Sequence, residues 1–225
     1  MPTATARSRP RRGAYHHGNL RPALISAGLE LLEVGGVEAL TLRAVARRAG
    51  VSHTAPYNHF ADRQALLAAV ATEGFEELGA SIAAATADVT APRERLRALA
   101  RGYLEFPATH PELYRLMFGN EIRDRAAHPE LVAADDAIAG AAREATAACL
   151  ALSARRPVAT EMASAAGWAL VHGLAALLID EQIQLPSGRL PDAAFQEEIA
   201  DLFLGALIPE DALAPEAVRT ARSEE

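Results

Sequence analysis

The amino-acid sequence predicts an all-α protein. Half of its 225 residues are hydrophobic, which is enough to form a sizeable core, and only 5% are aromatic. Alanine, leucine, arginine and glutamate dominate the composition, and these residues favour helices over sheet. No segment alternates apolar and polar residues in the way that a half-buried strand does. We therefore expect helices throughout the chain.

Four helices are expected in the N-terminal third. The first ends at Gly35-Gly36, and a short second helix ends at Gly50, because glycine tolerates the positive φ that such a turn needs. A third helix extends to about His59, and a fourth carries apolar residues inward at helical spacing. The residues expected to cap these helices at their N-termini are Asn19, Thr41, Ser52 and Asp62.

Prolines divide the chain after about residue 87 into further helices. Thr90 and Pro92 open a helix that Pro107 and Pro111 are expected to end. A turn is expected at residues 186–188, where the sequence reads Pro-Ser-Gly. The helices expected in this part of the chain are 92–106, a short one near 113–118, 129–155, 158–185 and 195–207.

One uncharged run has the length of a membrane span. Met162 to Ile179 contains no charged residue, but it is rich in alanine, glycine and serine and contains His172, which favours a buried core helix instead. The basic N-terminus has no following apolar run with a cleavage site, so we expect no signal peptide. The single cysteine, Cys149, excludes a disulfide scaffold. These features predict a cytoplasmic protein without a membrane partner.

Charge is distributed unevenly along the chain. The formal net charge is −7, yet residues 1–63 hold nine arginines and four acidic residues and carry +5, while the rest carries −12. A basic N-terminal region on an acidic body suggests that only this region meets a polyanion. The stretch 1–17 is expected to be a flexible basic arm, which either follows a DNA backbone or enters a minor groove, or else serves as a solubilising tail.

Residues 41–60 form the segment that indicates a function. Two short helices joined by a tight turn are predicted there, because Ala46 is small enough for close approach and Gly50 supplies the turn. The second helix is rich in hydrogen-bonding side chains and has no acidic residue, which suits a helix that reads base edges in the DNA major groove. An ordinary corner between two helices is the alternative interpretation.

The same segment resembles the TetR family of bacterial transcription regulators. The residues that carry the resemblance are Val45-Ala46, Ala49-Gly50-Val51-Ser52, Tyr57-Asn58-His59-Phe60, Arg63 and Leu66. Family members often have glycine where this chain has Thr54, and lysine where it has Arg63. A looser resemblance, in residues 15–20 and 168–173, is to a subgroup with a Trp-His-Gly C-terminal domain.

The resemblance implies which residues contact DNA. Thr41, Tyr57 and His59 are expected at phosphates, as is Arg63 from the start of the next helix. Arg43 is expected at a base, because arginine paired with guanine is the commonest specific contact. For each position, a solvated surface residue is the alternative. The other residues expected at the DNA surface are Ser52, His53, Thr54, Ala55 and Asn58, of which His53, Thr54 and Asn58 are candidate base readers.

The resemblance also implies a homodimer, in which the last two long helices of each subunit pair into a four-helix bundle. DNA recognition favours a dimer independently, because one reading helix makes too few contacts for useful specificity. The expected partners are a double-stranded DNA operator, a second copy of the chain and a small-molecule effector. No cofactor is expected, and the family favours repression over activation.

Trp168 and His172 lie four residues apart and therefore share one face of the predicted helix 158–185. They could form the aromatic wall and polar handle of an effector pocket; a core histidine beside a core tryptophan is the alternative. Tyr103, Tyr114 and Met117 are the other pocket candidates, and each could equally be plain core. The seven histidines include no pair at metal-ligand spacing, so no metal site is expected.

An enzyme and an architectural DNA-binding protein are the two alternatives to a transcription regulator. An enzyme is disfavoured, because the sequence has no glycine-rich phosphate loop and no Gly-x-Ser-x-Gly turn. An architectural helical protein that binds DNA without an effector stays open. The expected division of the chain is a basic arm (1–17), a DNA-binding domain with a three-helix helix-turn-helix (18–78), a regulatory and dimerisation domain (79–208) and a flexible tail (209–225).

Overall fold

The structure of the protein is a computed structural model that describes residues 20–152, 158–183 and 192–207. Within these ranges the chain forms eight α-helices and two 3₁₀ turns and no strand, so the all-α prediction is confirmed. The expected N-terminal arm, the cap at Asn19, the turn at 186–188 and the C-terminal tail lie outside the described residues.

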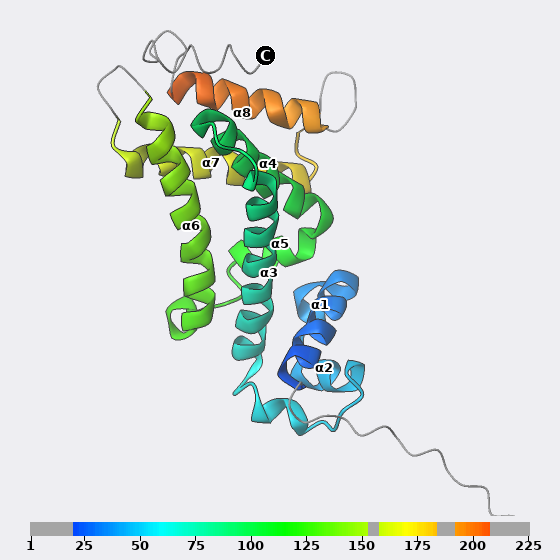
Figure 1. The fold of residues 1–225 in the computed structure, drawn as a ribbon. Helices are drawn as coiled ribbons and strands as arrows, with labels where there is room; N and C mark the ends of the chain where they lie inside the picture. The colour runs from blue at the N-terminus through cyan, green and yellow to red at the C-terminus, as the bar shows by residue number, and fades with distance from the viewer. Residues whose placement is uncertain (1–19, 153–157, 184–191, 208–225) are drawn as a thin grey trace, which may run out of the picture.

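The helices follow one another along the chain as Figure 1 shows. Their bounds are α1 (Leu20–Ala39), α2 (Leu42–Arg48), α3 (Arg63–Thr86), α4 (Pro92–Thr109), α5 (Pro111–Phe118), α6 (Pro129–Leu150), α7 (Thr160–Ile179) and α8 (Ala193–Leu207). The 3₁₀ turns are η2 (Ala55–Asn58) and η3 (Arg125–Ala127).

The molecule has a small head and a larger helical body, and α3 runs from one into the other (Figure 1). The head consists of α1, α2, η2 and the start of α3, while α4 to α8 form the body. One continuous apolar core extends through both parts, because α3 buries leucines at its start and Phe75 and Leu78 further along. α3 is therefore a continuous mechanical connection between the body and the head.

The turn between α2 and η2 is built as the sequence predicts. The Thr41 hydroxyl accepts a hydrogen bond from the backbone N–H of Ala44 at 3.1 Å and so caps α2. Gly50 has a φ of +70°, in the left-handed region that glycine adopts at least cost. Asp62 caps α3 in the same way, by accepting from the N–H of Ala65 at 2.9 Å.

This backbone geometry predicts opposite effects for one substitution at two glycines. Gly50→Ala should lower the free energy of unfolding by about 1–2 kcal/mol, because a Cβ is strained at positive φ. Gly140→Ala, in a helical position of α6 with open space around it, should raise that free energy by up to about 1 kcal/mol. Denaturant unfolding of both variants checks this, and a stabilised Gly50→Ala variant would contradict it.

The third predicted helix is wrong in type and length. In place of an α-helix from Ser52 to His59, the chain forms the 3₁₀ turn η2, with i-to-i+3 bonds such as Tyr57 N–H to Thr54 carbonyl at 3.2 Å. Pro56 lies in the first turn, where its missing N–H costs no helical hydrogen bond. Ser52 does not cap a helix; Thr54 precedes the turn.

Several helix ends also differ from the predictions. The predicted end of the first helix at Gly35-Gly36 is confirmed as a break in α1 at Gly36, where φ is +63° and ψ is −171°, and one further turn continues from there to Ala39. α4 contains Pro107 in its last turn and ends at Thr109, since a proline near the end of a helix removes only one backbone bond. α6 ends at Leu150 and α7 at Ile179, both earlier than expected. α5 starts at Pro111, slightly before the predicted position, and α6 starts at Pro129 as predicted.

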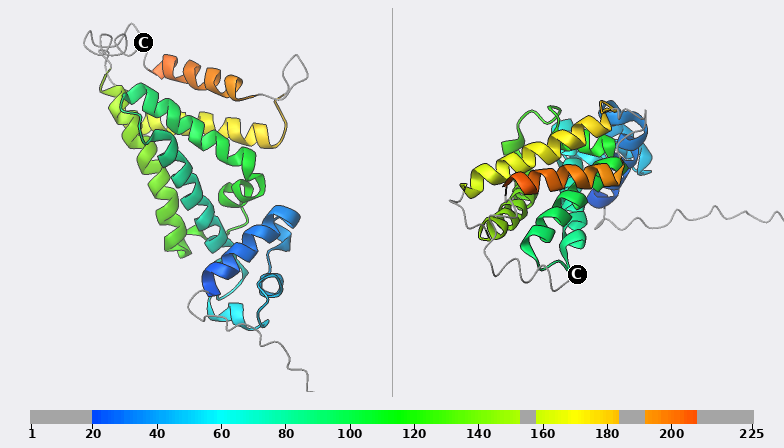
Figure 2. Two further views of the ribbon diagram at one scale, coloured as in Figure 1. Left: turned by 45° about the vertical axis from the view of Figure 1, so that its right-hand side comes forward. Right: turned by 90° about the horizontal axis from the view of Figure 1, so that it is seen from above.

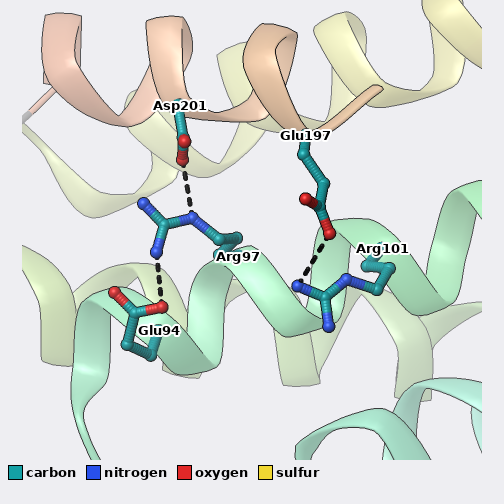
Figure 3. A network of polar contacts seen from close by, with 5 residues as sticks. All are labelled: Glu94, Arg97, Arg101, Glu197 and Asp201. Carbon is teal, nitrogen blue, oxygen red and sulfur yellow. Dashed lines mark hydrogen bonds and ion pairs between the residues drawn. The ribbon is translucent and has the colours of Figure 1, made fainter. Parts of the chain in front are cut away.

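In the body, α8 lies across α4 and beside α7, at the end of the molecule opposite the head (Figures 1 and 2). Two arginines of α4 hold it there (Figure 3). Arg97 donates to Asp201 at 2.6 Å and also pairs with Glu94, while Arg101 pairs with Glu197 at 3.1 Å. These ion pairs flank the apolar contact that α8 makes through Ala200 and Leu204.

The apolar helix α7 is not the buried core helix that its composition suggested. It is long and apolar enough to cross a membrane by length and composition, yet only 17% of its most apolar window is buried. Its buried residues are Ala163, Leu174 and Ala175, and Met162, Trp168 and Leu177 are exposed. One face of α7 is thus covered by the body, and the other is open in the single chain.

Candidate DNA-binding surface and effector cavity

The residues expected to contact DNA gather on the outer side of the head, around α2 and η2. Thr41, Arg43, Ser52, His53, Thr54, Tyr57, Asn58 and His59 are exposed, and Ala55 and Arg63 are half-buried. No acidic residue lies between Glu38 and Asp62. The surface can therefore approach phosphates without carboxylate repulsion.

Two buried residues hold η2 against the head. Pro56 is buried and Phe60 is 2% exposed within the main core, so this turn cannot swing away from α2. Tyr57 lies between them in sequence and is 53% exposed, an unusual position for a large aromatic ring. An exposed phenol on a fixed turn is available to a DNA backbone.

The arginines of the head differ in their surroundings. Arg43, at the start of α2, makes no ion pair within the described ranges, so its guanidinium is available to DNA. Arg48 pairs instead with Glu30 of α1. Arg63 is turned inward: its Nε donates to the Leu40 carbonyl at 2.8 Å and its Nη2 to the Val37 carbonyl at 2.6 Å.

A cavity of about 590 Å³, partly open to solvent, lies between α4, α5, α6, α7 and α8. This volume lies within the range of small-molecule sites. Of the five pocket residues expected from the sequence, Tyr103, Met117 and Trp168 line the cavity, whereas Tyr114 and His172 lie behind Tyr103. The larger apolar lining residues are Leu96, Leu99, Phe118, Ile138, Leu170, Val171 and Leu204.

Tyr103, Tyr114 and His172 form a small polar cluster at the wall of the cavity. The two hydroxyls are 2.9 Å apart, and Nδ1 of His172 lies 3.1 Å from the Tyr103 hydroxyl and 2.6 Å from that of Tyr114. Burial raises the pKa of Tyr103 to about 12 and that of Tyr114 further, and it lowers the pKa of His172 below 6.5. All three groups are therefore uncharged at neutral pH.

The charged residues of the cavity wall are compensated or peripheral. Arg125 donates to Asp135 at 3.0 Å and to the Met117 carbonyl at 2.6 Å, and its guanidinium lies 5.5 Å from the Phe75 ring centroid. Arg143 and Glu161 line the cavity from exposed positions on α6 and α7. The interior consequently offers apolar contact and hydroxyl hydrogen bonds, but no uncompensated charge.

Sequence reasoning missed the pair of Arg125 and Asp135. Neither residue belongs to a motif, so the sequence carries no signal that they pair. Their roles appear only because η3 and α6 meet at the cavity. Trp168 was found by its spacing from His172, and the two rings are stacked with centroids 4.9 Å apart.

The described residues contain no group of three His, Cys, Asp or Glu side chains that could hold a metal ion. Cys149 is fully buried, and burial raises the pKa of its thiol, which makes it a poor nucleophile. A helix-turn-helix head joined by one long helix to a helical body is the arrangement of a DNA-binding transcription regulator.

Comparison with known proteins agrees with this class. The family described as "Bacterial regulatory proteins, tetR family" matches residues 24–70, and "Tetracyclin repressor-like, C-terminal domain" matches residues 96–202. The chain belongs to the TetR family of transcriptional regulators, whose members are not enzymes. The looser resemblance to the Trp-His-Gly subgroup is not among these matches.

Individual relatives cover different parts of the chain. The HTH-type transcriptional activator FasR of Mycolicibacterium smegmatis is 30% identical over 115 residues, which are 48% of this chain and 52% of that protein. A protein of unknown function from Rhodococcus is 34% identical, with a TM-score of 0.73 over 87% of this chain and 99% of the other. PfmR of Thermus thermophilus shares the fold at 17% identity, with a TM-score of 0.57 over 82% and 96% of the two chains.

Proposed function

We propose that the protein is a cytoplasmic homodimer that binds a palindromic operator and releases it when a small molecule enters the cavity. The observation that carries the proposal is the continuity of α3, which begins beside the exposed surface of α2 and η2 and packs in the body against α4, α5 and α6. α3 thereby connects the candidate DNA-binding surface with α4, α5 and α6, which line the cavity.

Dimer formation is proposed through α7 and α8. Both helices lie at the end of the body away from the head, and in Figure 2 they run side by side. Large apolar side chains stay exposed there in the single chain: Met162 at 67%, Trp168 at 52% and Leu202 at 71%. Clustered apolar exposure of this kind marks a protein interface. A second copy covering this face would place the two heads on the same side of the dimer.

The effector is proposed to be an uncharged, largely apolar molecule. Apolar side chains dominate the cavity, and its inner arginine, Arg125, is already paired with Asp135. A buried ligand charge would have to be desolvated without a free partner, which costs several kcal/mol. Tyr103 presents the one hydroxyl of the polar cluster that reaches the cavity, so a single polar group on the ligand can be satisfied.

The sign of control is proposed to be repression, as the family resemblance favours, although the relative FasR carries the name of an activator. A reporter gene placed behind the selected DNA site separates the two. Repression predicts lower reporter output when the protein is co-expressed, and higher output would identify an activator.

Separate variants test the proposed roles at the DNA surface. Arg43→Ala and Asn58→Ala should relax the preference at particular base pairs by about 1–3 kcal/mol each, whereas Tyr57→Phe should weaken binding to all sequences alike. Binding of each variant to a panel of single-base operator changes measures this. The assignment of base readers fails if all three variants lose affinity with an unchanged sequence preference.

A further inference from the structure

The guanidinium of Arg63 is directed at the end of α1 and not at solvent. Arg63 is the first residue of α3, directly after the cap Asp62. Its Nε and Nη2 donate to the carbonyls of Leu40 and Val37 at 2.8 and 2.6 Å. The side chain is half-buried, and both carbonyls lie more than twenty residues before it in the sequence.

Arg63 adds two hydrogen bonds to a turn that has few of its own: the Val37 carbonyl also accepts from the Leu40 N–H at 3.1 Å. The last carbonyls of a helix have no intrahelical N–H partner. In α1 the backbone reverses its conformation at Gly36, so the turn of residues 37–40 that follows is held by few bonds of its own. The planar fork of an arginine can bond two carbonyls at once, which a single ammonium group cannot reproduce.

The segment that Arg63 holds leads directly into the DNA surface. Leu40 is fully buried, and the next residue is Thr41, the cap of α2. One side chain therefore connects the end of α1, the start of α2 and the start of α3. Asp62 caps the first turn of α3 itself, so Arg63 is the residue of this pair whose side chain reaches the end of α1.

We propose that Arg63 is a positioning residue, which sets the orientation of α2 and η2 relative to α3, and that its contribution to operator affinity comes from this role and not from a phosphate contact. The inference rests on the proposed operator binding. In a dimer the effect is doubled, because both heads must fit the two half-sites at once.

A lysine at position 63 distinguishes a positioning role from a phosphate contact. It keeps the positive charge but lacks the planar guanidinium that bonds both carbonyls. Arg63→Lys should weaken binding to a DNA site obtained by in vitro selection by about tenfold or more, since a hydrogen bond from a charged donor contributes at least one such factor. Its affinity for random duplex DNA and the slope of log K against log salt should stay as in the unsubstituted protein. Arg63→Gln should show the same loss with the same slope, and Arg47→Lys, an exposed arginine of α2, is the matched control.

A phosphate contact predicts different results. Arg63→Lys would then bind the selected site normally, and Arg63→Gln would lower the salt slope by about 0.9. Either result overturns the proposal. All binding is measured well below the melting temperature of each variant; a parallel loss of selected-site and random-DNA binding would show a merely structural role and also overturn it. Failure of the unsubstituted protein to enrich any DNA site would instead refute the proposed operator binding.

Discussion

Placing charge on the open face of α7 and α8 is expected to abolish operator binding. The double variant Met162→Glu, Leu202→Glu puts two carboxylates where the single chain exposes apolar side chains. Burying them in a dimer interface would cost several kcal/mol each, so the variant should be a monomer. A monomer reads one half-site, and its affinity should fall toward that of non-specific binding, by about 10³-fold or more.

Light scattering after gel filtration measures the first effect, and fluorescence anisotropy with the selected DNA site measures the second. The unsubstituted protein should have about twice the chain mass of 23.8 kDa. Ala108→Glu adds the same kind of charge at an exposed position of α4 and should change neither result. A dimeric double variant, or a monomeric one that binds the palindrome normally, would refute the proposed interface.

Ligand binding in the cavity should weaken DNA binding about 5–150-fold, the range given by a coupling free energy of about 1–3 kcal/mol. A ligand shifts an equilibrium only by its difference in affinity for the two states. The DNA-released state must therefore bind the ligand more tightly. Because such coupling is reciprocal, saturating operator DNA should weaken ligand binding by the same factor.

The probe for this experiment is a straight-chain alcohol, selected from a series of chain lengths by thermal shift. The carboxylate and ammonium compounds of the same length are its controls, and they should bind more weakly because the cavity interior has no uncompensated charge. Titrating the alcohol with and without operator gives the coupling. Equal ligand affinity in the two titrations would leave a DNA-binding protein without a ligand switch.

The local features of the head could be predicted from the sequence because short-range rules govern them. Thr41 and Asp62 have side-chain oxygens that can cap a helix, and Gly50 tolerates the positive φ of the turn. Phe60 occupies a core position of the motif. The prediction of the third helix was wrong in type and length, since the polar residues 52–59 carry too little apolar periodicity to distinguish a 3₁₀ turn from a longer helix.

The cavity could be predicted only in outline, because its wall comes from helices far apart in the sequence. Spacing linked Trp168 with His172, but the hydrogen bonds of His172 to Tyr103 and Tyr114 depend on how α4, α5 and α7 pack. The inward direction of Arg63 could not be predicted either, because its partners are distant in the sequence. Its partners are carbonyls 23 and 26 residues earlier in the chain, which local sequence rules cannot link to it.

In vitro selection of random DNA by the purified protein tests the central claim most directly. A homodimer with one reading surface per chain should enrich a palindrome whose two half-site centres are about 34 Å, or a multiple of it, apart along the duplex. The most strongly selected base pairs should be those next to Arg43 and Asn58. The selection at these base pairs should be lost in the corresponding alanine variants. Enrichment of a single unrepeated half-site, or of no sequence at all, would contradict the account of a dimeric operator-binding regulator.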